Sequence, residues 1–154
     1  MSLTPEQKRL VRSSWALVRP IQEEAARLFY GRLFETDPST RHLFAHSDMA
    51  KQGRMLMQTI NIAVSSLDRL EQILPAIEDL GRRHAGYGVT EAHYASVGGA
   101  LLWTLGQGLG EAFTPEVEQA WAETYRTLAS VMQAAAAEET EDGASTAASR
   151  RLAS

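Results

Sequence analysis

The fold of this chain is decided by the segment Ile73-Leu74-Pro75-Ala76-Ile77-Glu78-Asp79-Leu80-Gly81-Arg82-Arg83-His84. Its apolar residues Ile77 and Leu80 recur with His84 at helical spacing, so the imidazole points to the same side of a helix as the apolar side chains. A neutral imidazole that faces an apolar interior can bind a metal. The alternative is a buried histidine hydrogen-bonded to a backbone carbonyl, which is the commoner arrangement for an isolated histidine. The surrounding motifs decide between the two.

Those motifs are mostly aromatic and come in a characteristic order. They are Phe29-Tyr30-Gly31-Arg32-Leu33-Phe34, Asp37-Pro38, Arg41-His42-Leu43-Phe44, Ala92-His93-Tyr94 and Phe113-Thr114-Pro115. In this order the chain resembles the globin family over residues 3–136, with bacterial single-domain haemoglobins of the flavohaemoglobin-like and neuroglobin-like branches the most similar. The resemblance implies an all-α globin fold, a helical sandwich around a haem pocket, with haem b as the cofactor.

The resemblance also assigns roles to individual residues. His84 is expected to ligate the haem iron through one ring nitrogen, while the other donates a hydrogen bond to a carbonyl near Leu80. Tyr30 and Gln52 are expected to stabilise a gas ligand, because a hydroxyl and an amide donate to the partial negative charge of dioxygen. The alternatives are a core tyrosine bonded to backbone and a surface glutamine at a helix start. The remaining haem contacts are expected from Phe44, Leu56, Leu80, Val89, Tyr94 and Val97.

Two features leave the mechanism open. His46 lies between Phe44 and the next helix, where it is either a sixth ligand to the iron or a solvated loop residue. In flavohaemoglobins the proximal histidine joins a network with a tyrosine and a glutamate, and Tyr94 matches that tyrosine. The glutamate position is Ala136 here, and Glu138 follows two positions later. The network is therefore predicted to be incomplete, which disfavours peroxidase-like chemistry.

Composition excludes several other classes of protein. The 154 residues correspond to one domain, and the net charge of −4 provides no basic stripe for nucleic acid. The sequence contains no cysteine, which excludes disulfides, thiolate metal sites and thiol nucleophiles. We find neither a signal peptide nor a membrane span in the sequence and expect a cytoplasmic protein.

Helical patterns cover most of the chain, and no segment reads as a convincing strand. Thr4 and Gln7 are predicted to form a capping box, with Pro5 at the first helical position. Further helices are expected over residues 21–35 and 48–67. Another is expected to end near Gly86, and two more are expected to begin at Thr90 and at Thr114-Pro115. We expect the globin domain to span residues 1–137. Beyond it the acidic, alanine- and serine-rich composition favours a disordered tail over residues 138–154.

Three functions are compatible with these residues. The first is a haem protein that binds dioxygen, nitric oxide and carbon monoxide and converts nitric oxide to nitrate. It would need an external reductase, because the chain has no glycine-rich dinucleotide motif. The second is a non-enzymatic oxygen carrier or store, and the third is a gas or redox sensor. Tyr30 and Gln52 favour the first, because two donors slow the release of oxygen. The oligomeric state stays open.

Overall fold

A computed structural model describes the backbone of residues 3–153 and the side chains of residues 3–138. Residues 3–153 form helices and turns without a strand, which confirms the all-α prediction. The α-helices are α1 (Pro5–Val18), α2 (Gln22–Thr36), α3 (Met49–Ser65), α4 (Leu70–Gly86), α5 (Glu91–Leu109) and α6 (Pro115–Ala153). Short 3₁₀ helices lie between them: η1 (Arg19–Ile21), η2 (Pro38–Phe44), η3 (Leu67–Arg69) and η4 (Gly110–Ala112). Over the same residues, no helix is both long and apolar enough to cross a membrane.

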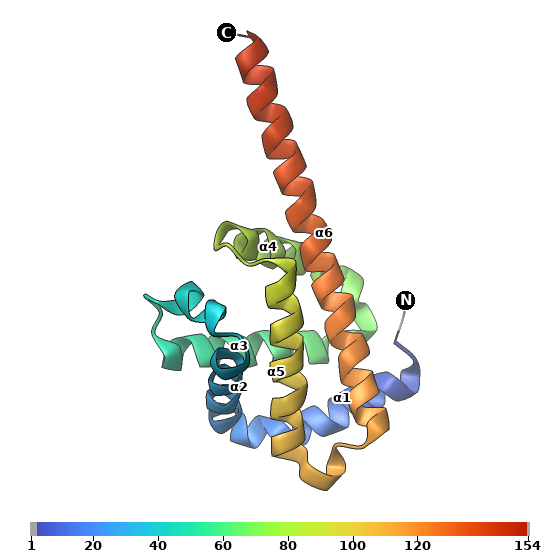
Figure 1. Ribbon diagram of the computed structural model, residues 1–154. Helices are drawn as coiled ribbons and strands as arrows, with labels where there is room; N and C mark the ends of the chain where they lie inside the picture. Colours follow the sequence, from blue (N-terminus) through green and yellow to red (C-terminus); the bar gives the residue numbers. More distant parts are fainter. Residues whose placement is uncertain (1–2, 154) are drawn as a thin grey trace.

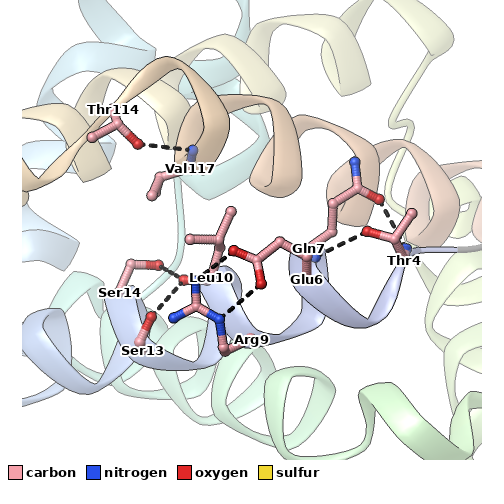
Figure 2. A network of polar contacts seen from close by, with 9 residues as sticks. All are labelled: Thr4, Glu6, Gln7, Arg9, Leu10, Ser13, Ser14, Thr114 and Val117. Atoms are coloured by element: carbon pink, nitrogen blue, oxygen red, sulfur yellow. Dashed lines mark hydrogen bonds and ion pairs between the residues drawn. The ribbon is translucent and has the colours of Figure 1, made fainter.

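Polar side chains determine where the helices begin. The Thr4 hydroxyl accepts from the backbone N–H of Gln7 (3.1 Å), and the Gln7 side chain accepts from the backbone N–H of Thr4 (3.0 Å; Figure 2). This confirms the predicted capping box of α1. The Asp48 carboxylate caps α3 by accepting from two backbone N–H groups of its first turn. Thr90 caps α5 in a second capping box, whose partner is His93.

A core built around two tryptophans joins α1, α3 and α6. The rings of Trp15 and Trp121 lie 6.0 Å apart. The indole N–H of Trp15 donates to the Asn61 side chain at 3.0 Å, and that of Trp121 donates to the Ser14 hydroxyl at 2.8 Å. Because both indole nitrogens have partners, the two rings are held in place, and they fix α1 against α3 and α6.

The helix that carries His84 lies directly against α6 (Figure 1). At the point of closest approach α4 has Gly81, where a Cβ atom would overlap the backbone carbonyl group of Met132. The missing side chain is therefore what allows the two helix backbones to approach so closely. Since Gly81 lies three residues before His84, this contact also sets the position of the imidazole.

We expect Gly81→Ala to destabilise the protein, because neither backbone can move away from the added methyl group without disturbing the packing. Overpacking of this kind costs about 1–3 kcal/mol of unfolding free energy. Urea unfolding followed by circular dichroism measures the loss. The matched control is Gly86→Ala on the same helix, where a Cβ meets nothing within 4 Å. Equal stabilities for the two variants would show that the α4–α6 contact is not tight.

The last helix continues beyond the other elements, and its C-terminal turns project away from them (Figure 1). Its backbone is helical to Ala153, in a segment where composition favours disorder. The side chains after Glu138 lie outside the described residues. A domain boundary after Ala137 therefore stays a prediction.

Truncation after Ala137 is expected to change the unfolding free energy by less than about 0.5 kcal/mol, because the acidic segment has no apolar stripe to bury. Thermal unfolding of the full-length and truncated chains measures the difference. A large loss of stability on truncation would place the boundary nearer the C-terminus.

Candidate functional site

Four of the residues predicted around the haem meet in one apolar group, which we call the tyrosine cluster: Tyr30, Phe44, Leu56 and Val97. They come from α2, η2, α3 and α5 respectively. The rings of Tyr30 and Phe44 lie edge to face, with centroids 5.3 Å apart. Because these four residues come from four different elements, they meet only when all four elements are packed.

Tyr30 lies at the centre of this cluster, and only 7% of its surface is exposed. Burial raises the pKa of its phenol, and a side-chain hydrogen bond with Gln52 partly opposes that rise. The phenol therefore stays protonated at neutral pH and can donate a hydrogen bond. Gln52 reaches it from the first turn of α3, where its backbone N–H donates to the Asp48 carbonyl at 2.8 Å. The structure thus brings the two predicted ligand-stabilising residues together.

His84 lies in the last turn of α4 with its ring orientation fixed by a local hydrogen bond. Nδ1 is 2.8 Å from the carbonyl oxygen of Leu80. A carbonyl can only accept, so Nδ1 carries the proton and Nε2 keeps a free lone pair. Burial lowers the pKa of the imidazole, the Leu80 hydrogen bond opposes this, and the charge of Arg83 lowers it further. The ring is consequently a neutral imidazole that can bind a metal through Nε2.

A backbone hydrogen bond connects the loop after α4 to His84. The backbone N–H of Val89 donates to the carbonyl of His84 at 3.1 Å. Leu80, His84 and Val89, all half-buried, therefore form a second group, the histidine group, made from α4 and the loop that follows it. The loop turns at Gly88, whose φ of 90° is a conformation that side chains disfavour.

The Tyr94 hydroxyl is the one buried side-chain polar atom that has no hydrogen-bond partner in the described part of the chain. Burial raises the pKa of this phenol. Its carbonyl accepts from the Tyr125 hydroxyl at 2.6 Å, which fixes the backbone of Tyr94 on α5. Glu138 is exposed on α6. A buried hydroxyl without a protein partner is the arrangement expected beside a bound group that is not part of the protein.

The other histidines belong to neither of these two groups. His46 is exposed in the turn before α3. His93 is buried and belongs to the capping box of α5, and the ring of His42 lies 6.4 Å from it. The polar partners of His93 were not predicted from the sequence, although Thr90-x-x-His93 has the spacing of a capping box.

Comparison with known proteins places this site in context. Residues 27–132 match the sequence model of the family described as Globin. The chain is 33% identical to a flavohemoprotein of Bordetella parapertussis over 132 residues, which are 84% of this chain and 33% of the relative. It is 30% identical to a neuroglobin of Tetraodon nigroviridis over 155 residues, covering 92% of this chain and 98% of the relative. The chain thus spans about a third of the length of the flavohemoprotein and almost all of the neuroglobin.

Proposed function

We propose that this chain, which belongs to the globin family, holds haem through His84 and uses it to convert nitric oxide and dioxygen to nitrate. Haem would supply an iron atom with one position open to a diatomic gas. Haem b is favoured because the sequence has no cysteine to attach a haem covalently. The observation that carries the enzymatic part of the proposal is the hydrogen bond between Tyr30, which belongs to the buried tyrosine cluster, and Gln52, which is half-buried beside it.

The histidine group supplies what a haem ligand requires. The Leu80 carbonyl holds Nδ1–H at 2.8 Å, which leaves Nε2 unprotonated and sets the ring plane. Without this bond the imidazole would rotate about its side-chain torsions, and part of the binding free energy would be lost in fixing it. The unpartnered hydroxyl of Tyr94 supports a bound group on the side of α5 that also carries Val97.

The tyrosine cluster and the neighbouring Gln52 supply the donors. Bound haem would supply an iron atom that holds a diatomic ligand, and neutral donors in a half-buried, largely apolar environment would stabilise partial negative charge on that ligand. The phenol of Tyr30 and the amide of Gln52 are two such donors. They would retain dioxygen long enough for nitric oxide to reach it. The reaction NO + O₂ + e⁻ gives nitrate, so continued turnover needs one electron for each nitric oxide, from a reductase that we expect to be a separate partner in the cytoplasm.

A second candidate is a non-enzymatic oxygen carrier or store. It is favoured by the Tyr94 hydroxyl, which no described residue bonds, and by the alanine at position 136. Without a carboxylate in this network, the imidazole would donate less electron density to the iron, and redox chemistry would gain less from the protein.

Rapid mixing of nitric oxide with the reduced, oxygen-saturated protein tests the proposal. We expect one nitrate for each haem and a ferric spectrum after a single turnover, followed by repeated turnover only when an electron donor is added. Absorption spectra of the reduced, oxidised and carbon monoxide-treated protein establish the haem content beforehand. If the protein carries haem but forms no nitrate, the oxygen carrier or store is the function that remains.

A further inference from the structure

Two helices of this chain begin with the same reciprocal pair of hydrogen bonds, and the two pairs differ in one chemical property. In α1 the second member is Gln7, whose amide does not titrate (Figure 2). In α5 the second member is His93: the Thr90 backbone N–H donates to Nδ1 at 3.0 Å, and the His93 backbone N–H lies 3.4 Å from the Thr90 hydroxyl. The cap of α5 therefore depends on the protonation state of an imidazole.

The hydrogen bonds around His93 specify which ring nitrogen carries the proton. A backbone N–H can only donate, so Nδ1 must be unprotonated and Nε2 must carry the hydrogen. Nε2 lies 3.4 Å from the hydroxyl of Ser39. That hydroxyl donates to one carboxylate oxygen of Asp37, and the Ser96 hydroxyl donates to the other oxygen at 2.7 Å. With 8% of its surface exposed, His93 joins the start of α5 to Asp37 and η2 as a neutral ring.

In the described part of the chain, a carboxylate and a second imidazole lie near this ring. Asp37, at the end of α2, has its pKa lowered by the hydroxyls of Ser39 and Ser96, and a positive charge on His93 would lower it further. The ring of His42, on η2, lies 6.4 Å away. A protonated His93 is attracted to the carboxylate of Asp37 and loses its hydrogen bond with the Thr90 N–H. The two partners of the ring therefore favour opposite protonation states.

We propose that His93 is a proton-controlled cap: the neutral ring holds the first turn of α5, and the imidazolium ring releases Thr90 and pairs with Asp37. The segment it controls is the connection between α4 and α5. Val89 immediately precedes Thr90 and is bonded to the carbonyl of His84 at 3.1 Å. Protonation of His93 would loosen this connection behind the histidine group.

The proposal is tested by amide hydrogen exchange. The exchange is measured by NMR on the purified protein in the presence of a reductant and carbon monoxide. Between about pH 8 and pH 5 the protection factor of the Thr90 amide should fall roughly fivefold, the factor expected for loss of one hydrogen bond. The fall should follow the titration of the His93 ring signals. His93→Gln copies the pair in α1 without the titration, so the Thr90 amide should stay protected at both pH values.

Two further measurements keep the result specific. The Thr4 amide, in the α1 cap, should show no change in either protein. His42→Gln should leave the pH effect on Thr90 intact, which excludes the neighbouring ring as its source. The proposal is overturned if the ring of His93 stays neutral down to pH 5, if it titrates without any change at Thr90, or if the Thr90 amide loses protection equally in His93→Gln.

Discussion

His84→Ala is expected to abolish haem retention while leaving the helical content nearly unchanged. Loss of a hydrogen bond that supports a metal ligand already costs about 10- to 100-fold in affinity, and removal of the ligand itself should cost more. The helix should survive, because α4 is held against α6 at Gly81 and not through the imidazole. Haem content is measured by absorbance after gel filtration, and helical content by circular dichroism.

A control variant and a rescue experiment make this test specific. His46→Ala removes an exposed histidine and should keep a normal haem spectrum. Imidazole added in solution should partly restore haem binding to His84→Ala, because the space left by the side chain can accept it. If His84→Ala retains a normal haem spectrum without added imidazole, the ligand is another residue.

Tyr30→Phe is expected to speed oxygen dissociation about 10- to 100-fold. A hydrogen bond to a charged acceptor contributes about 1.5–3 kcal/mol, and this range converts directly to that ratio of rates. The substitution removes the hydroxyl and keeps the ring, so the edge-to-face contact with Phe44 at 5.3 Å should persist. Stopped-flow displacement of oxygen by carbon monoxide measures the rate.

Gln52→Leu should act in the same direction as Tyr30→Phe. Because the two side chains interact, their effects should not add in the double variant. Carbon monoxide carries little charge when bound, so its release should change much less in each variant, which controls for altered packing. Fast oxygen release from the native protein, unchanged in Tyr30→Phe, would contradict the scavenger function and favour the carrier.

Features that depend on neighbouring residues were predictable from sequence. The helical spacing of Ile77, Leu80 and His84 predicts the helix and also the bond from His84 to the Leu80 carbonyl, because residues four apart lie one turn apart on a helix. The capping box of Thr4 follows in the same way. In each case the geometry of a single helix sets the distance, and no other part of the chain enters.

Tertiary structure alone decided which residues meet across elements. Nothing in the spacing of Gly81 indicates that it faces the carbonyl of Met132, 51 positions later in the numbering. The hydrogen bond from Ser96 to Asp37 is equally invisible in the sequence. Such contacts depend on the angles and distances at which helices pack, and these are set by the fit of many side chains at once. The amino-acid sequence therefore determined the histidine and its orientation, whereas helix packing decided the surroundings in which that histidine works.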